Sequence, residues 1–427
     1  MVNRYAMQIK IKSSGVISGI VSLPSSKSIC NRALAIGALA GCFDDICNLS
    51  DCDDTVVMAN WLRFKPSTVN VGAAGTAMRF STALLAVSDG KHVITGSERM
   101  QNRPISVLVD ALRTLGAKID YVRKDGFPPL SIEGCPGLCK DAVSLPGNVS
   151  SQYISALLII GPTLKHGLTL SLTGKIVSKP YIDMTISIMR QFGACVFWVE
   201  EEGKPLRIKV LPYAYKMRPY FVESDWSAAS YWYEMVALAK NDDASVELPS
   251  LFSSSLQGDS CGAKVFDMLG VETLFEENKV LLKKKAITVD RLDYDFVNMP
   301  DLAQTFVVTC CMLGIPFHFT GLESLKIKET DRIFALKNEL SKLGFNLEDR
   351  NDSELLWDGN KRTVSENELQ SISIDTYEDH RMAMSFAPVA MVNGSVLINE
   401  PKVVSKSYPN YWNDLASVGL VISVSAE

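Results

Sequence analysis

Six short segments of the sequence place charged, hydroxyl or amide side chains at the start of an apolar, helix-like run. These starts fall at Lys27-Ser28, Thr76, Ser151, Ser227, Asp301 and Asp379. A helix start offers backbone N–H groups without a partner inside the helix and the positive end of the helix dipole, and both attract an anion. The dipole disfavours Lys and Arg there by about 0.3–1 kcal/mol each, so cations gathered at helix starts predict a bound anion between them.

The first of these segments is a serine-rich loop that ends in a lysine. Lys27 and Ser28 follow Ser25 and Ser26, and Arg32 comes one turn into the apolar run. N–H donors, hydroxyl groups and two cations would converge there on a phosphate or a carboxylate. The alternative is a solvated helix cap with a surface lysine.

Four further segments of the N-terminal half carry weaker signals of the same kind. They contain Gly75, which would let a ligand approach the backbone, Arg103 in a loop, Ser150, Ser151 and Gln152 at a helix start, and Ser178 and Tyr181 after a strand. The first three have an ordinary structural alternative, which is a tight turn, solvent-facing arginines or N-capping by serine, respectively.

The densest charge cluster is Lys328-Glu329-Thr330-Asp331-Arg332, directly before an apolar helix-like run. A lysine beside a glutamate can supply an acid–base pair, and Arg332 can hold a carboxylate with two hydrogen bonds. Asp301, Arg381 and Lys406 occupy comparable polar positions nearby in the sequence. The alternative is a charged helix start with internal ion pairs.

The elements that must position these residues recur along the chain. Successive starts from Thr76 to Asp379 are 74 to 78 residues apart, whereas Ser28 and Thr76 are 48 apart. Between them, a helix-like run ends in Leu/Phe-Gly and is followed by two strand-like runs, with the glycines at Gly116, Gly193, Gly270 and Gly344. A glycine just past a helix is the usual left-handed cap. The pattern predicts an α/β fold of six β-α-β-α-β-β repeats, the first of which lacks about 27 residues that would form its glycine-capped hairpin.

Composition restricts the function classes. The chain has 427 residues, 47% of them hydrophobic, and a formal net charge of −5. These values predict two or three globular domains and give no global basic field for nucleic acid. The longest apolar stretch, residues 154–164, is too short to cross a bilayer, and the N-terminus lacks the apolar region of a signal peptide.

The ten cysteines and four histidines form no metal-binding or paired Cys-x-x-Cys pattern. We expect buried or incidental thiols of a reducing cytoplasm, and neither a disulfide nor a metal site.

Taken together, the motifs resemble those of the EPSP synthase (3-phosphoshikimate 1-carboxyvinyltransferase) family of enolpyruvyl transferases, from about residue 17 to 409. The resemblance is carried by Ser26-Lys27-Ser28 with Asn31-Arg32, Gly75-Thr76-Ala77-Met78-Arg79, Arg103-Pro104-Ile105, Ser150-Ser151-Gln152, Ser178-Lys179-Pro180-Tyr181, Lys328-Glu329-Thr330-Asp331-Arg332 and Asp379-His380-Arg381-Met382-Ala383-Met384.

The resemblance implies a two-lobed, inside-out α/β fold with three repeats in each lobe and an active site in the cleft between the lobes. One lobe would comprise residues 1–26 and 224–427, and the other residues 27–223. A monomer without a metal or organic cofactor is expected, and so is a cytoplasmic location without nucleic-acid or membrane partners.

The resemblance also implies transfer of the enolpyruvyl group of phosphoenolpyruvate to the 5-hydroxyl of shikimate 3-phosphate, by addition and elimination through a tetrahedral intermediate. Catalytic roles would fall to Asp301 as base, to Glu329 and Lys328 in proton transfer, and to Lys27. Shikimate 3-phosphate would contact Lys27, Ser28, Arg32, Ser150, Ser151, Gln152, Ser178, Tyr181, Asp301 and Lys328. Phosphoenolpyruvate would contact Lys27, Gly75, Arg103, Gln152, Arg332, Arg381 and Lys406.

Three positions depart from the family pattern, which usually has Asn at Ala73, often Pro at Phe80 and often Asn at Ser324. Two other functions stay open at this point. One is enolpyruvyl transfer to UDP-N-acetylglucosamine, although the loop at residues 96–103 lacks the Cys expected of that enzyme. The other is a non-catalytic paralogue that keeps the fold.

Overall fold

The computed structural model describes residues 7–425 of the chain and confirms the α/β class. The chain divides into two compact units, of which unit 1 is Met1–Pro24 with Ser224–Glu427, and unit 2 is Ser25–Glu223. That these units are the two lobes of one enzyme stays a prediction.

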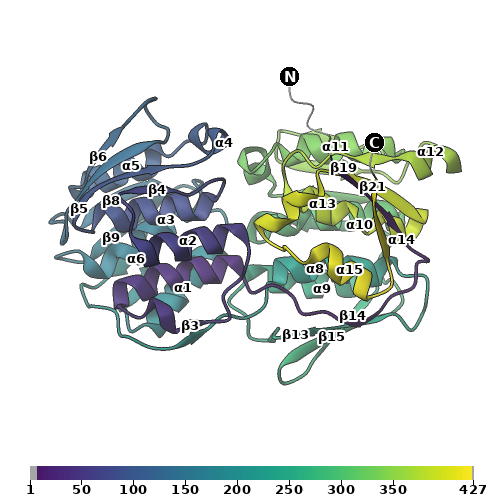
Figure 1. The fold of residues 1–427 in the computed structure, drawn as a ribbon, viewed down its shortest axis with the longest axis horizontal. Coiled ribbons are helices and arrows are strands. Elements are labelled where there is room, and N and C mark those ends of the chain that lie inside the picture. The colour runs from purple at the N-terminus through teal and green to yellow at the C-terminus, as the bar shows by residue number, and fades with distance from the viewer. Residues whose placement is uncertain (1–6, 426–427) are drawn as a thin grey trace. The chain divides into compact units, whose positions relative to one another are not determined.

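Unit 1 is built from three four-stranded sheets and eight α-helices within its described residues. Figure 1 labels these helices along the chain. Its strands are β1 (Gln8–Lys12), β2 (Ser18–Ile20), β13 (Ser245–Pro249), β14 (Val271–Phe275), β15 (Lys279–Lys284), β16 (Leu292–Asp295), β17 (Phe317–Thr320), β18 (Glu348–Arg350), β19 (Glu354–Trp357), β20 (Ser373–Ile374), β21 (Ser395–Asn399) and β22 (Val421–Ser425). Its helices are α8 (Trp226–Leu238), α9 (Gly262–Met268), α10 (Ala303–Leu313), α11 (Arg332–Lys342), α12 (Glu366–Ser371), α13 (His380–Phe386), α14 (Val389–Asn393) and α15 (Tyr411–Ser417). Short 3-10 helices, η3 (Gly258–Cys261), η4 (Phe296–Asn298), η5 (Pro300–Leu302), η6 (Glu323–Ile327) and η7 (Pro401–Lys406), link them.

Unit 2 contains two four-stranded sheets and one two-stranded sheet. Its strands are β3 (Ile46–Cys47), β4 (Thr68–Asn70), β5 (Gly90–Thr95), β6 (Lys118–Tyr121), β7 (Leu130–Gly134), β8 (Ala142–Pro146), β9 (Leu168–Thr173), β10 (Val196–Val199), β11 (Leu206–Val210) and β12 (Tyr220–Phe221). Its helices are α1 (Lys27–Ala40), α2 (Asp53–Phe64), α3 (Gly75–Ala86), α4 (Glu98–Gln101), α5 (Ser106–Leu115), α6 (Ser151–Ile160) and α7 (Lys179–Gln191), with the 3-10 helices η1 (Phe43–Asp45) and η2 (Gly161–Thr163).

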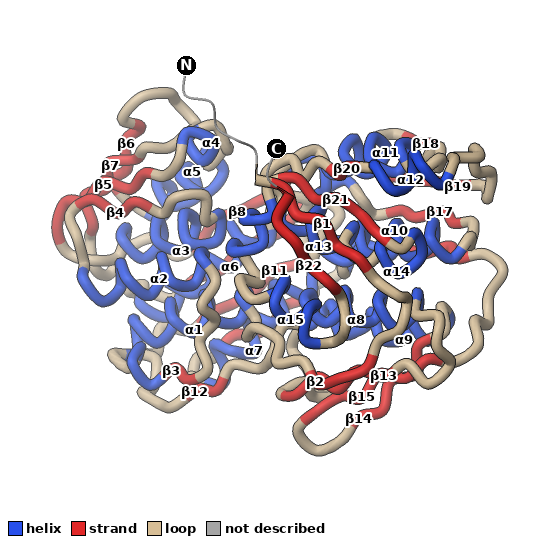
Figure 2. Tube along the Cα trace, turned by 45° about the vertical axis from the view of Figure 1, so that its right-hand side comes forward, coloured by secondary structure: helices blue, strands red, loops and turns tan. Residues whose placement is uncertain are grey.

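Within residues 7–425, the five four-stranded sheets share one topology. The first two strands pair in parallel, and the second and third strands, like the third and fourth, pair antiparallel. Examples are the orders β8-β9-β11-β10 and β2-β13-β15-β14. Strand β1, from the N-terminus, lies between β21 and β22 from the C-terminal end, and Figure 2 shows these three strands side by side. The sixth sheet has only the parallel pair β3 and β12. The division of the sequence into six repeats stays a prediction.

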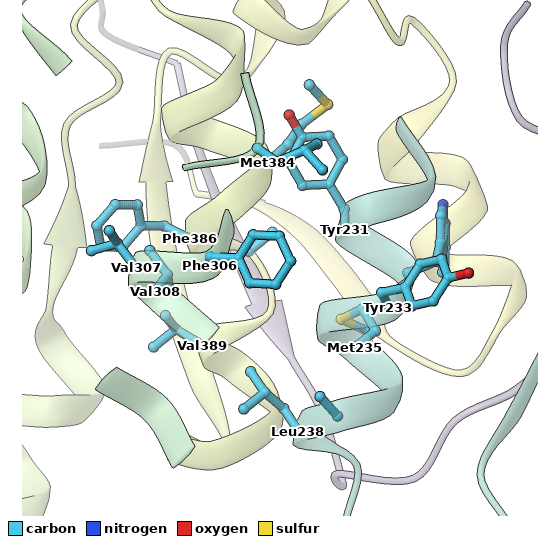
Figure 3. Close-up of a cluster of buried hydrophobic side chains, with 14 of the residues drawn as sticks. Tyr231, Tyr233, Met235, Leu238, Phe306, Val307, Val308, Met384, Phe386 and Val389 are labelled. Atoms are coloured by element: carbon cyan, nitrogen blue, oxygen red, sulfur yellow. The ribbon is translucent and has the colours of Figure 1, made fainter. Parts of the chain in front are cut away.

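Helices α8, α10 and α13 of unit 1 are largely buried, because most of their residues are apolar or small. Every residue of α8 is buried, and Tyr231 and Tyr233 of this helix meet Phe306 of α10 and Met384 of α13 in one core (Figure 3). The ring of Phe306 also stacks on Phe266 with 4.3 Å between centroids. This packing fixes where α8, α10 and α13 begin, and therefore where their polar first residues lie.

Most helix starts agree with the sequence prediction to within one residue, including α1 at Lys27, α6 at Ser151 and α13 at His380. The prediction that an α-helix begins at Asp301 was wrong. Asp301 lies in the 3-10 helix η5, whose first residue is Pro300, and α10 begins at Ala303.

The predicted glycine caps are confirmed, because all four glycines have positive φ. At Gly344, with φ of 90°, a Cβ would lie 2.4 Å from the carbonyl oxygen of Arg362. Helix α2 lacks such a glycine and ends instead at Lys65, a residue with φ of 45°, before β4.

Candidate active site

Helix starts of unit 2 gather around the buried guanidinium of Arg32. Helix α1 packs on α3, α6 and α7, and Arg32 is 2% exposed. Its Nε donates to Thr185 Oγ1 at 2.7 Å, and its Nη1 and Nη2 donate to the carbonyl oxygens of Ser28 at 2.8 Å and of Tyr181 at 3.3 Å. The rings of Phe80 and Tyr181 lie 5.5 and 5.8 Å from Cζ.

Every one of these partners of Arg32 is electrically neutral. Burial therefore lowers the pKa of Arg32 to about 10, although the nearby Tyr181 raises it in part. A buried cation that meets only neutral groups is costly unless an anion approaches it. Phe80, one of the departures from the family pattern, supports the charge through the face of its ring.

Lys27 begins α1 and lies beside a carboxylate of α2. Its Nζ is 3.7 Å from Oδ2 of Asp54, whose side chain is 4% exposed. A buried carboxylate keeps the ammonium group at the helix start, where a second anion could share it.

Gly75 and Arg103 lie against one another at the start of α3. A Cβ at position 75 would be 2.9 Å from Arg103 Nη1, so only glycine leaves the guanidinium in this place. Gln152, in the first turn of α6, donates from Nε2 to Thr76 Oγ1 at 3.1 Å. The starts of α3 and α6 are thereby joined to the Arg103 loop.

The two serines at α6 behave differently. Ser150 caps the helix, since its Oγ accepts from the N–H of Gln152 at 3.3 Å, which is the ordinary alternative that the sequence left open. Ser151 is buried in the first turn. Ser178 occupies the N-cap position of α7 in the left-handed conformation, with φ of 54°, but its side chain makes no capping hydrogen bond. Tyr181, in the first turn of α7, is half-buried.

In unit 1 the predicted residues form one network of ion pairs around Asp301. Oδ1 of Asp301 lies 3.2 Å from Lys328 Nζ and 3.3 Å from Arg332 Nη1, and Oδ2 lies 3.1 Å from Arg381 Nη2. Burial by itself would raise the pKa of Asp301, but the charges of Arg381, Lys328 and Arg332 together hold this pKa well below its usual value. Asp301 is therefore a carboxylate at neutral pH.

Arg332 and Glu329 extend this network. Arg332 is 1% exposed and donates from Nε to Asp379 Oδ2 at 2.7 Å and from Nη2 to Glu329 Oε2 at 3.0 Å. Lys406 Nζ donates to Glu329 Oε1 at 2.6 Å. Four cations thus meet three carboxylates within unit 1.

Sequence reasoning named Asp379 as a helix start but missed two other carboxylates of these sites, Asp54 and Asp259. Asp54 lies in the acidic first turn of α2, Asp379 serves as the N-cap of α13, and Asp259 lies in the short helix η3. The N-cap position of Asp379 agrees with the helix start expected there, since an Asp directly before a helix is the usual capping signal. Asp54 and Asp259 reach the site through the tertiary fold.

No helix among residues 7–425 is long and apolar enough to span a membrane. Within the same residues, no cluster of three or more His, Cys, Asp or Glu side chains has the arrangement of a metal site.

Comparison with known proteins assigns the chain to a family. The family model of EPSP synthase (3-phosphoshikimate 1-carboxyvinyltransferase) matches residues 63–415. The 3-phosphoshikimate 1-carboxyvinyltransferase of Bacteroides fragilis strain YCH46 is 56% identical over 422 residues, which cover 99% of this chain and 100% of the relative. The chain belongs to the EPSP synthase family.

Solved structures of EPSP synthase family members and other enolpyruvyl transferases share the fold. The EPSP synthase of Acinetobacter baumannii superposes with a TM-score of 0.75 at 21% identity, covering 98% of this chain and 100% of that one. The enolpyruvyl transferase NikO of Streptomyces tendae superposes with a TM-score of 0.71 at 14% identity, covering 99% of both chains.

Proposed function

We propose that this EPSP synthase family member transfers the enolpyruvyl group of phosphoenolpyruvate to the 5-hydroxyl of shikimate 3-phosphate, releasing phosphate. This is the shikimate pathway step toward chorismate and the aromatic amino acids. The observation that carries the proposal is the Asp301 carboxylate held among Lys328, Arg332 and Arg381 in a chain of this family.

The residues of unit 2 suit a phosphorylated hydroxy acid. The buried charge of Arg32 and the ammonium group of Lys27 would face phosphate oxygens, and the hydroxyl groups would bind the polar edge of the ring. We assign to shikimate 3-phosphate Lys27, Ser28, Arg32, Ser150, Ser151, Gln152, Ser178 and Tyr181, together with Asp301 and Lys328.

The phosphate and carboxylate of phosphoenolpyruvate need several cations. Arg103 beside Gly75 is one, and the network around Asp301 supplies Arg332, Arg381 and Lys406. We assign these residues to phosphoenolpyruvate together with Lys27 and Gln152. Both substrates are anions, so each cation removed should cost a few kcal/mol of transition-state stabilisation.

The reaction needs a base for the 5-hydroxyl and a proton for the methylene carbon. In the addition step, the hydroxyl oxygen bonds to C2 of phosphoenolpyruvate, the hydroxyl proton passes to Asp301, and a proton from Lys328 or Glu329 enters C3. In the elimination step, C3 returns a proton to the same Lys328 or Glu329, the C2–O bond to phosphate breaks, and the leaving phosphate takes the proton held by Asp301. Both steps balance with protons alone, and Lys27 would stabilise the charge at the reacting carbon.

The low pKa of Asp301 makes it a weak base while three cations surround it. Anionic substrates that bind Arg332 and Arg381 would take part of this charge away from Asp301. The pKa of Asp301 would then rise toward the value that proton transfer requires. In this way, substrate binding itself would activate the base.

The test measures phosphate release from phosphoenolpyruvate with shikimate 3-phosphate and, in parallel, with UDP-N-acetylglucosamine. We expect release with the first acceptor only. Release with the second acceptor would identify the cell-wall reaction instead, and release with neither would indicate a protein that keeps the fold without catalysis.

We further propose that the chain works as a monomer in the cytoplasm and binds neither nucleic acid nor membranes. The formal net charge of −5 supports the part of this proposal that concerns nucleic acid.

A further inference from the structure

A buried carboxylate that the proposed chemistry does not use lies next to the phosphoenolpyruvate residues of unit 1. Asp259, in η3, is 4% exposed, and its Oδ2 accepts a hydrogen bond from Ser227 Oγ. Among the described residues, its Oδ1 has no hydrogen-bond partner. Because a buried charge without full hydrogen bonding is costly, such a carboxylate is expected to have a role that offsets the cost.

The loop that carries Asp259 is tied to the start of α8. Gln257 accepts from the N–H of Trp226 through Oε1 at 3.0 Å and donates from Nε2 to the carbonyl oxygen of Ser224 at 2.8 Å. These two hydrogen bonds fix the loop on both sides of the helix start. Asp259 therefore has a defined position relative to Ser227.

Ser227 connects this carboxylate to Arg381. Its Oγ lies 3.5 Å from Arg381 Nη2, and the same nitrogen lies 3.1 Å from Asp301 Oδ2. The other nitrogen, Nη1, lies 3.4 Å from the hydroxyl group of Tyr231. The guanidinium thus lies between the Ser227–Asp259 pair and Asp301.

We infer that Asp259 is a positioning residue that acts through Ser227 to hold the Arg381 guanidinium against Asp301. This inference rests on the proposed function, in which Arg381 binds phosphoenolpyruvate and Asp301 is the base. A guanidinium held from two sides would present its charge to the anion in one orientation, and a loss of either contact would loosen it.

The charge on Asp259 should also tune this arrangement. Burial, and next the charge of Asp301, raise the pKa of Asp259 to about 7, with a smaller contribution from Asp225, while Arg381 opposes the rise. Below this pH Asp259 is neutral. Above this pH, Asp259 is a second carboxylate near Arg381, in addition to Asp301. The two carboxylates together offset more of the positive charge of Arg381, so Arg381 attracts an incoming anion less strongly. Affinity for phosphoenolpyruvate should therefore fall as the pH rises through about 7.

Steady-state kinetics between about pH 6 and pH 8 test the inference. We expect the wild-type KM for phosphoenolpyruvate to rise about tenfold across this range, and Asp259→Asn, which is always neutral, to keep a flat KM. Ser227→Ala should raise KM about tenfold at each pH with a smaller change in kcat. Ser230→Ala removes a buried hydroxyl one turn further along α8 and should behave as wild type.

A titration of the protein labelled with 13C at the aspartate carboxyl carbons reports on Asp259 without turnover. The Asp259 signal should titrate near neutral pH in the wild type and at lower pH in Asp301→Asn. If the wild type shows no turnover but this titration is as expected, the proposed function fails while the coupling of the two carboxylates stands. The inference is overturned if Asp259→Asn retains the wild-type pH profile, if Ser227→Ala retains the wild-type KM, or if Asp259 titrates in the ordinary acid range.

Discussion

Asp301→Asn separates the role of Asp301 as a base from its role in holding cations. The substitution keeps the size of the side chain but removes a charge that lies 3.1 to 3.3 Å from three cationic nitrogens. A positioned general base contributes typically about 10²–10⁴-fold, so we expect kcat to fall by about that factor, which corresponds to an activation barrier higher by about 3 to 5 kcal/mol.

Binding should change in the opposite direction. A unit-charge pair at about 4 Å interacts by about 4 kcal/mol at an effective dielectric constant of about 20. An anionic substrate must compete with this attraction while Asp301 is charged. Its removal should therefore leave the dissociation constant of phosphoenolpyruvate unchanged or lower it by about tenfold, after allowance for solvent screening.

The fold should persist in this variant, because Arg332 retains its pairs with Asp379 and Glu329. The assay combines single-turnover phosphate release with calorimetric titration of phosphoenolpyruvate. Both measurements are repeated on Asp301→Ala, which lacks the side-chain amide that Asn introduces. Asp293→Asn is the matched control, because Asp293 belongs to the same unit and its side chain is 58% exposed. Phosphate release at the wild-type rate would refute the assignment of the base. A hundredfold loss of binding in Asp301→Asn would show that Asp301 organises the cations instead.

Three glycines give further predictions. Gly75→Ala places a Cβ 2.9 Å from Arg103 Nη1 and should displace this guanidinium. Initial-rate kinetics should then show a KM for phosphoenolpyruvate raised about tenfold, with a smaller change in kcat. An unchanged KM would place Arg103 outside the binding site. Gly344→Ala combines φ of 90° with a Cβ 2.4 Å from a backbone oxygen, and urea unfolding should show a loss of about 2–4 kcal/mol. Gly116 has φ of 107°, and a Cβ there would meet no atom within 4 Å. Gly116→Ala should therefore lower the free energy of unfolding by only about 1 kcal/mol. Equal losses in Gly116→Ala and Gly344→Ala would show that the close contact at position 344 is relieved at no cost.

The sequence predicted the elements wherever a local rule decides. Gly116 and Gly344 were recognisable as left-handed caps because no other residue adopts positive φ as readily, and α1 was recognisable from the polar residues before its apolar run. The start at Asp301 was misplaced because Pro300 begins a 3-10 turn, and this adds most of a turn before α10.

The candidate site was predictable in its cations and in the carboxylates of Asp301, Glu329 and Asp379, but not in those of Asp54 and Asp259. Lys328, Glu329 and Arg332 are neighbours in the sequence, so their charge pattern was visible directly. Asp259 stands alone among small and polar residues, and Asp54 is one of several acidic residues at the start of α2. Only the packing of separate helices brings them to Ser227 and Lys27. Long-range contacts of this kind leave no periodic signal in the chain.

The central claim is that this chain joins the enolpyruvyl group to a hydroxyl by addition followed by elimination. A single time course of 31P and 1H NMR in deuterium oxide, with phosphoenolpyruvate and shikimate 3-phosphate, tests this claim most directly. We predict equal amounts of phosphate and of an enol ether product, with deuterium in the methylene group of the product because C3 becomes a methyl group in the intermediate. Phosphate without an enol ether, or an enol ether without deuterium, would contradict it.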